Sequence, residues 1–357
     1  MDLAGADLRA KHGQTGKGNG QMRVYISGAA GFIGYHLARL LLDEGITVRG
    51  MDGMTDYYDV TLKRGRLAGL MQHPGFSFAE FMLEDAARLS RDIADFRPDA
   101  IVHLAAQAGV RYSLEAPRSY LSSNIEGTFN IIEAARDAKV GHLLLASTSS
   151  VFGANTDMPY RETDKADTQV SLYAATKKAT ESLSHAWAHL YALPTTCFRF
   201  FTVYGPWGRP DMAPFKFTRA ILAGETIDVY GHGNMFRDFT YVTDLTRAIR
   251  LLIDAIPERP ASPEEIAEGD SLSPVAPWRV VNIGNGEKVA LEDFIAAIEA
   301  ATGKSAQKHY MEMQKGDVPA TWADNSLLRR LTGYRPETNI RDGIAEFVKW
   351  YRDYYRP

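Results

Sequence analysis

Residues 23–34 read RVYISGAAGFIG and decide the fold. Five β-prone residues lead into Gly28, Gly31 and Gly34, and an apolar segment with helical periodicity begins at Phe32. Glycine lets the backbone approach a pyrophosphate closely, and the N-terminus of the following helix supplies free N–H groups and a positive dipole. The spacing therefore predicts a strand, a tight turn and a helix that together bind a dinucleotide.

An acidic residue follows at the distance that such a site requires. Asp52 ends the next expected strand, about twenty residues after the glycine turn, where a carboxylate accepts hydrogen bonds from ribose hydroxyls. A carboxylate there repels a 2′-phosphate, so the sequence favours NAD over NADP as the cofactor.

Beyond this unit, short β-rich segments alternate with helical ones up to about residue 204. The expected strands cover residues 23–27, 47–51, 76–82, 100–104, 142–147 and 196–201, and the expected helices cover 32–44, 84–96, 117–138 and 172–191. Alternation of this kind predicts an α/β fold with a Rossmann-like, doubly wound parallel sheet that is covered on both faces. Apolar strands such as HLLLAS agree with burial on both sides.

After about Tyr204, Gly and Pro become frequent and the strict alternation ends. Helical patterns return at residues 291–302 and 344–355, and residues 257–277 suggest a surface excursion. We therefore expect an NAD-binding domain over 22–204 and a smaller C-terminal α/β substrate domain over 205–357, partly interleaved with the first. Residues 1–21 are polar and glycine-rich, which predicts a disordered N-terminal extension.

A second motif carries candidate catalytic groups. Tyr173 and Lys177 are four residues apart at the start of a helix, so they share one face. A nearby ammonium and the positive nicotinamide of the oxidised cofactor would favour the phenolate of Tyr173. Thr148, Ser149 and Ser150 end an expected strand, and parallel strands present these ends at the edge where ligands bind. A hydroxyl there can share a proton with a substrate alcohol and the phenolate.

Composition excludes several classes of protein. The chain has 357 residues, 45% of them hydrophobic and 24% charged, and its net charge of −4 argues against a general nucleic-acid binder. No run approaches the ~18 apolar residues of a membrane span, and the N-terminus lacks a signal-peptide core. The single cysteine, Cys197, agrees with a reduced, cytoplasmic compartment. We expect no metal site and no membrane or nucleic-acid partner.

The motifs also resemble a known family. GAAGFIG, HLAAQAGVRYS, LLASTSSVFGAN, SLYAATKK and RFFTVYGPWGRPDMA, in this order, are similar to the extended short-chain dehydrogenase/reductases and, more closely, to the bacterial UDP-glucuronate 4-epimerases. The resemblance runs from about Met22 to the C-terminus. It implies tightly bound NAD, a UDP-sugar substrate and a homodimer in which the helices that begin at Pro117 and Leu172 pack across a two-fold axis.

The resemblance also assigns roles to individual residues. Tyr173 is the expected base, Lys177 holds the nicotinamide ribose and tunes Tyr173, and Thr148 bonds the reacting 4-oxygen. The expected cofactor contacts are Gly28, Gly31, Phe32, Ile33, Gly34, Asp52, Leu104, Ala105, Ala106, Tyr173 and Lys177. The expected substrate contacts are Thr148, Ser149, Ser150, Thr202 and Arg209 around the sugar and its carboxylate, Arg237 at the diphosphate, Tyr230 beside uracil, and Arg111 near the anionic groups.

Two positions depart from the family pattern. Met82 stands where the third strand often ends in an aspartate that contacts adenine, with Glu84 and Asp85 just beyond. Gln314, Lys315, Gly316 and Asp317 stand where a UDP-galactose epimerase typically has Arg-Pro-Gly-Asp. One diphosphate arginine is therefore expected to be absent.

The residues after Thr148 separate related reactions that share a 4-keto sugar. A 4,6-dehydratase has Asp-Glu where this chain has Ser149 and Ser150, and a UDP-glucuronate decarboxylase commonly has Glu at the second position. We therefore expect reversible C4 epimerisation of UDP-glucuronate to UDP-galacturonate. A UDP-glucose or UDP-N-acetylglucosamine 4-epimerase, the decarboxylase and a non-catalytic NAD-binding sensor remain as alternatives.

Overall fold

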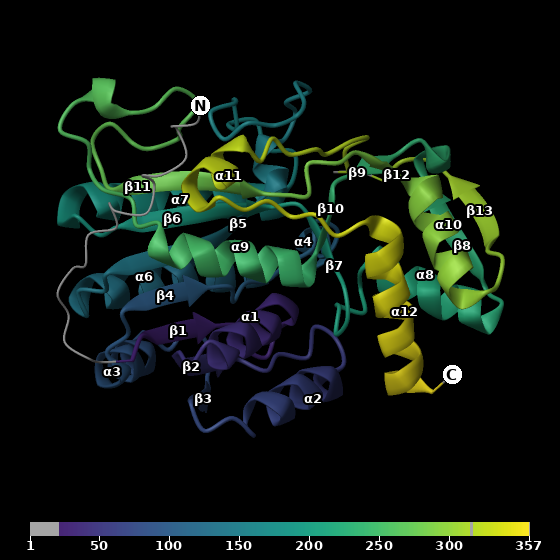
Figure 1. Cartoon of the computed structure of the whole chain (residues 1–357), viewed down its shortest axis with the longest axis horizontal. Coiled ribbons are helices and arrows are strands. Elements are labelled where there is room, and N and C mark those ends of the chain that lie inside the picture. The colour runs from purple at the N-terminus through teal and green to yellow at the C-terminus, as the bar shows by residue number, and fades with distance from the viewer. Residues whose placement is uncertain (1–20, 315–316, 357) are drawn as a thin grey trace, which may run out of the picture.

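The central element is a parallel sheet of seven strands in the order β11-β6-β5-β4-β1-β2-β3, seen in a computed structural model that describes residues 21–314 and 317–356 (Figure 1). The confirmed fold is the Rossmann-like, doubly wound sheet expected from the sequence. The strands are β1 (Arg23–Ser27), β2 (Thr47–Asp52), β3 (Phe76–Glu80), β4 (Ala100–His103), β5 (His142–Thr148), β6 (Thr195–Phe200) and β11 (Trp278–Ile283).

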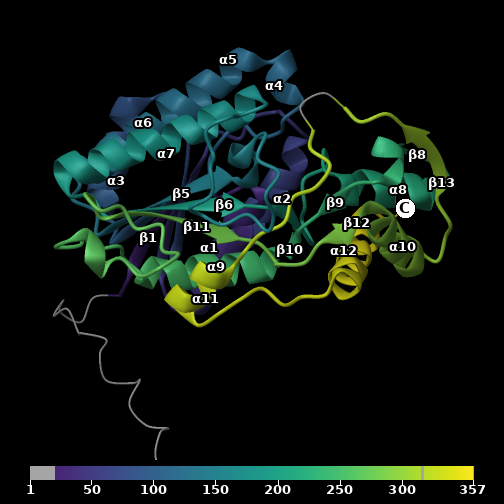
Figure 2. The same ribbon diagram turned by 90° about the horizontal axis from the view of Figure 1, so that it is seen from above.

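Helices cover both faces of this sheet (Figure 2). One layer consists of α3 (Ala86–Phe96), α6 (Gly127–Asp137) and α7 (Leu172–Tyr191), and the other contains α1 (Phe32–Asp43) and α9 (Val242–Asp254), with α2 (Val60–Leu70) and α11 (Ser326–Thr332) beside them. Because the strands are covered on both sides, each can consist almost wholly of apolar residues.

Several helical regions differ from the expectation, since α9 and α11 were not expected either. Residues 117–138 do not form one regular helix, because α5 (Pro117–Tyr120) is joined to α6 by a π-helical segment, Leu121–Glu126, and α4 (Tyr112–Glu115) precedes both. In that segment the buried Asn124 bonds Gln107 O and Thr176 Oγ1. The sequence also gave no indication of α2, because its inward face carries the buried cations Lys63 and Arg66.

A smaller unit lies beside the carboxyl ends of the strands (Figure 1). It contains α8 (Ala213–Ala223), α10 (Leu291–Thr302), α12 (Ile340–Tyr355) and the parallel pair β8 (Thr226–Tyr230) and β13 (Gln307–Met311). The short strands β7 (Thr202–Tyr204), β9 (Phe236–Arg237), β10 (Phe239–Tyr241) and β12 (Val289–Ala290) lead into it. Its core includes Phe215, Phe239 and Phe294, with Phe239 and Phe294 stacked at 4.6 Å between ring centroids.

Two elements from beyond residue 204 pack with the large sheet. β11 pairs in parallel with β6, and α9 packs against α1. The division of the chain at residue 204 into two partly interleaved domains stays a prediction. The predicted N-terminal extension lies outside the described residues except for Gln21. None of the described helices is long and apolar enough to span a membrane.

The topology brings the sequence motifs to one edge of the sheet. The glycine turn follows β1, Asp52 ends β2, Leu104 follows β4 and Thr148 ends β5. The strand order reverses between β1 and β4, and such a reversal opens a crevice at the carboxyl ends of the strands.

Candidate active site

A cavity of about 1030 Å³ opens along this edge and extends to the smaller unit. Its wall includes every residue that the sequence analysis selected: Gly28, Gly31, Phe32, Ile33, Gly34, Asp52, Leu104, Ala105, Ala106, Arg111, Thr148, Ser149, Ser150, Tyr173, Lys177, Thr202, Arg209, Tyr230 and Arg237. The fold therefore brings both motifs and the expected substrate contacts together.

The glycine turn leaves no room for side chains. Gly28 has a φ of +77°, and a Cβ at this position would lie 2.7 Å from Ala105 N. A Cβ on Gly34 would lie 2.1 Å from Gly28 O. Helix α1 begins after Gly31 without a side-chain cap and without an acidic residue in its first turn. Its first N–H groups and its dipole thus suit the pyrophosphate of a dinucleotide.

A cation accompanies Asp52. Its Oδ1 accepts a hydrogen bond from Met54 N at 2.8 Å, and Lys63 Nζ lies 3.6 Å from the same oxygen. Lys63 lines the cavity and is almost fully buried. Sequence reasoning missed Lys63 because it missed α2. The preference for NAD over NADP was inferred from repulsion between Asp52 and a 2′-phosphate. The positive charge of Lys63 makes that repulsion weaker than it would be with Asp52 alone.

A carboxylate also lies near the unusual Met82. Met82 and Glu84 both line the cavity, and Glu84 Oε1 accepts a hydrogen bond from Ser123 Oγ at 3.1 Å. Glu84 Oε2 is buried and has no hydrogen-bond partner among the described residues. The cavity thus has a carboxylate close to the position of the missing aspartate.

The candidate catalytic groups come from α7 and β5. Ser171 caps α7 by accepting a hydrogen bond from Ala174 N at 3.2 Å, so the helix begins just before Tyr173. Tyr173 and Thr148, at the end of β5, both line the cavity, and Thr148 acts to lower the pKa of the phenol. Lys177 Nζ donates to Ala146 O at 2.8 Å, and burial lowers the pKa of Lys177 to about 8. The arrangement joins a phenol and a hydroxyl at the wall of the cavity.

The protein's own groups shift the pKa of Tyr173 in both directions. Burial raises the pKa of this phenol, and the opposing effects of Thr148 and of the charge of Arg209 do not outweigh burial. Lys177 is not among the groups that dominate this pKa. Among the protein's own groups, the cation that lowers this pKa is therefore Arg209, and the effect of the nicotinamide charge stays a prediction.

Arg209 forms a two-point ion pair. Its Nε donates to Asp211 Oδ1 at 3.0 Å and its Nη2 donates to Oδ2 at 2.5 Å. Tyr57 OH donates to Asp211 Oδ2 at 3.2 Å, and the Arg209 guanidinium carbon lies 5.7 Å from the centre of the Tyr57 ring. The nearby Thr202 is fixed through its backbone, which donates to Asp238 O at 3.0 Å.

The other two arginines also have partners. Arg237 Nη2 lies 2.7 Å from Asp317 Oδ1, so a carboxylate already engages the expected diphosphate ligand. The guanidinium of Arg111 lies over the Tyr230 ring at 4.9 Å, which brings together two residues expected near the nucleotide. Of the unusual segment 314–317, Lys315 and Gly316 lie outside the described residues.

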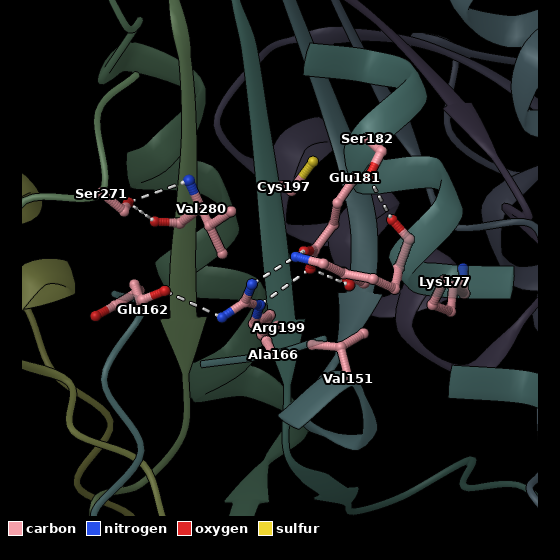
Figure 3. A network of polar contacts seen from close by, with 12 residues as sticks. Val151, Glu162, Ala166, Lys177, Glu181, Ser182, Cys197, Arg199, Ser271 and Val280 are labelled. Atoms are coloured by element: carbon pink, nitrogen blue, oxygen red, sulfur yellow. Dashed lines mark hydrogen bonds and ion pairs between the residues drawn. The ribbon is translucent and has the colours of Figure 1, made fainter. Parts of the chain in front are cut away.

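A buried polar network supports this site from within the protein (Figure 3). Glu181, one turn after Lys177 on α7, binds Arg199 of β6 through two contacts of 3.0 and 2.9 Å. Glu181 Oε1 also accepts from Ser147 Oγ at 2.7 Å, next to Thr148. The network therefore ties α7 to the strand end that carries the hydroxyl. The described residues contain no cluster of side chains able to hold a metal ion.

Comparison with known proteins agrees with this geometry. The profile of the "NAD dependent epimerase/dehydratase family" matches residues 24–265. This chain belongs to that family. The resemblance to extended short-chain dehydrogenase/reductases of the UDP-glucuronate 4-epimerase type is therefore confirmed. The prediction of NAD as the cofactor is confirmed as well, because the family is NAD dependent.

Similar members of the family cover almost the whole chain. A Rhizobium meliloti (strain 1021) protein named "Probable UDP-glucuronate 4-epimerase" is 52% identical over 94% of this chain and 98% of its own length. Protein CapI of Staphylococcus aureus is 51% identical over 94% and 100%. The crystal structure of a Bacillus cereus UDP-glucuronic acid 4-epimerase with UDP-glucuronic acid and NAD has a TM-score of 0.82 at 31% identity, covering 94% of this chain and 100% of that one.

The polar cavity residues that the sequence reasoning did not select include Tyr57, Lys63 and Asp211, which contact selected residues or their partners. Asp211 lies inside the motif that contains Arg209, so an aspartate two residues after a candidate anion-binding arginine was the available signal. Tyr57 and Lys63 had no such signal, because only the fold brings them to the cavity.

Proposed function

We propose that this enzyme reversibly converts UDP-glucuronate to UDP-galacturonate by inverting C4 through a 4-keto sugar, with tightly bound NAD. One observation carries the proposal: Thr148, Tyr173 and Arg209 line the same cavity, and Thr148 and Arg209 both act to lower the pKa of the Tyr173 phenol. A proton-transfer group beside a guanidinium suits a substrate with both an alcohol and a carboxylate. The similar proteins named for this activity support the same conclusion.

The residues of the chain would divide the work as follows. Thr148 would bond the 4-oxygen, and Tyr173 would take its proton and later return it. Lys177 would hold the nicotinamide ribose, while the glycine turn and Asp52 would hold the pyrophosphate and the adenosine ribose. NAD, when bound, supplies a reversible two-electron acceptor beside C4. Inversion requires the keto sugar to turn over between the two hydride transfers. The protein must therefore release the sugar ring and bind it again by its opposite face.

The carboxylate needs its own restraint. A hexuronic 4-ketone is a β-keto acid and loses CO2 when the bond to the carboxylate aligns with the carbonyl π system. We assign Ser149, Ser150, Thr202 and Arg209 to holding the carboxylate out of that alignment. Arg237 would bind the diphosphate, Tyr230 would lie beside uracil, and Arg111 would complete the anionic end.

We also propose that the enzyme is a cytoplasmic homodimer. The layer that contains α4, α5 and α7 exposes Leu114, Leu121, Leu190 and Tyr191, which are 67, 49, 64 and 50% accessible. Apolar exposure on this layer supports the expected packing of the helices that begin at Pro117 and Leu172 across a two-fold axis. The only cysteine, Cys197, is free and buried, which agrees with a reducing compartment.

The test is to incubate the purified enzyme with UDP-glucuronate, without added NAD, and to follow the products by NMR. UDP-galacturonate formation supports the proposal and shows that NAD is retained. A UDP-pentose with CO2 would instead identify a decarboxylase, and turnover of UDP-glucose alone would identify a neutral-sugar epimerase. Tyr173→Phe should lose turnover and keep its NAD, and unchanged turnover would contradict the assigned base.

A further inference from the structure

Two side chains, those of Asp211 and Tyr57, lie beside the guanidinium of Arg209. Asp211 binds Arg209 through two atoms, and Tyr57 OH in turn donates to Asp211. All three side chains line the cavity, and those of Arg209 and Asp211 are only 21 and 26% accessible. An acidic side chain thus already occupies an arginine that is expected to bind an acidic substrate.

The geometry shows that one guanidinium can serve both carboxylates. The bonds to Asp211 are made by Nε and Nη2, so they use one side of the planar fork. The edge that carries Nη1 makes no bond to Asp211 and can receive a second carboxylate. The Tyr57 ring lies beside the same guanidinium, at 5.7 Å from its central carbon. Asp211 and Tyr57 together therefore restrict both the plane and the direction of the fork.

We propose that Asp211 and Tyr57 are positioning residues that orient Arg209, so that a uronate carboxylate bound at its free edge is kept out of line with the C4 ketone. This inference rests on the proposed function. Asp211 and Tyr57 would thus determine whether the keto sugar is reduced to the epimer or loses CO2. Arg209 itself makes the contact with the substrate.

The alternative is that Asp211 is merely a competitor that the substrate displaces. The local chain argues against displacement, because Met212 N donates to Arg209 O at 3.2 Å and closes a turn that holds Arg209 and Asp211 side by side. Tyr57 adds a contact from a distant part of the chain. The two alternatives differ in outcome, since removing a competitor tightens uronate binding, whereas removing a positioning group changes which product forms.

The experiment compares Asp211→Asn and Tyr57→Phe with the wild-type holoenzyme. Asparagine keeps the shape and one acceptor oxygen, and phenylalanine keeps the ring while removing the bond to Asp211. Epimerisation and UDP-pentose formation are followed together by NMR, and UDP-glucuronate binding is measured by calorimetry. For Asp211→Asn we expect kcat for epimerisation to fall roughly tenfold and the UDP-pentose to rise to about a tenth of the product, as when a reacting geometry is loosened. For Tyr57→Phe we expect a change in the same direction of about threefold.

Asp317→Asn is the matched control, because it removes an aspartate from the other arginine–aspartate pair in the cavity, the one with Arg237. It should alter nucleotide affinity without altering the ratio of epimer to pentose. A second measurement is the pH profile of kcat. Loss of the negative charge of Asp211 leaves Arg209 freer to stabilise the phenolate of Tyr173, so the acidic limb should move to lower pH in Asp211→Asn.

The outcomes separate the two proposals. Tighter UDP-glucuronate binding by Asp211→Asn with an unchanged product ratio would overturn the positioning role and identify a competitor. An increase in pentose with Asp317→Asn equal to that with Asp211→Asn would also overturn it. Failure of the wild-type enzyme to form UDP-galacturonate would instead contradict the proposed function.

Discussion

Removal of either partner of the Glu181–Arg199 ion pair should destabilise the fold by several kcal/mol (Figure 3). The two side chains are 1 and 3% accessible, and they meet through contacts of 2.9 and 3.0 Å. A buried charge that loses its partner remains buried and unpaired, which typically costs about 3–5 kcal/mol. Replacing both partners by apolar residues of similar size is usually close to neutral, so a double variant should recover most of the loss.

The two single variants leave different charges behind. Arg199→Met leaves the Glu181 carboxylate with Ser147 Oγ at 2.7 Å and Lys178 Nζ at 3.0 Å, so we expect a loss of about 3 kcal/mol at pH 8. Glu181→Gln leaves the Arg199 guanidinium with Glu162 O at 3.2 Å and the Phe152 ring at 4.7 Å. We expect about 4 kcal/mol there, because arginine cannot lose its proton.

The pH dependence distinguishes the variants. In the wild type, burial raises the pKa of Glu181, but Arg199 outweighs it and the net pKa is lowered. The pair therefore stabilises the fold above the usual carboxyl pKa of about 4.3, and this stabilisation is lost as the pH falls through the lower folded value. In Arg199→Met burial prevails and the folded pKa rises above the unfolded one. The deficit of Arg199→Met should then shrink from pH 8 to pH 5.5. That of Glu181→Gln should not shrink, because Arg199 keeps its charge and the nearby Glu162, with a pKa raised by burial to about 7, loses its charge over this range.

The assay is urea unfolding of wild type, both single variants and Arg199→Met/Glu181→Leu at pH 5.5 and pH 8, followed by tryptophan fluorescence. Free energies of unfolding come from linear extrapolation. Single-variant losses below about 1 kcal/mol, the size of an exposed pair, would refute the reasoning. A double variant as unstable as the sum of its parts would refute it as well.

Three further predictions concern the cavity. Gly34→Ala places a methyl group 2.1 Å from Gly28 O, so the purified variant should contain little NAD, measured by absorbance after denaturation. Asp52→Asn leaves Lys63 without its carboxylate, so NADP affinity relative to NAD should rise about tenfold in competition calorimetry, and an unchanged ratio would exclude Lys63 from the ribose site. Lys177 has a pKa lowered by burial from 10.5 to about 8, so its charge destabilises the fold below pH 8 and this cost fades towards pH 10.5. The free energy of unfolding of Lys177→Met should therefore exceed that of the wild type by about 2 kcal/mol at pH 7, with no such gain near pH 10.5. The variant should also lose epimerase activity.

Much of the site was predictable because its rules are local. The glycine turn depends on steric space at Gly28 and Gly34, and the Tyr173–Lys177 pair depends on the helical repeat. Alternation of strands and helices determined the parallel sheet, and the parallel sheet placed the ends of β1, β2, β4 and β5 at one edge. The sequence by itself therefore determined the fold class and the NAD cofactor, and it predicted which groups hold that cofactor and which react.

Only the tertiary structure decided how charge is arranged around those groups. It brought Lys63 to Asp52, Tyr57 to the Arg209–Asp211 pair, and β11 to the edge of the large sheet. It also determined that burial has the largest effect of the protein's own groups on the pKa of Tyr173. The physical reason is that periodicity and steric rules act between near neighbours in the chain, whereas pKa values and ion pairing depend on distances between remote segments and on how completely they exclude water.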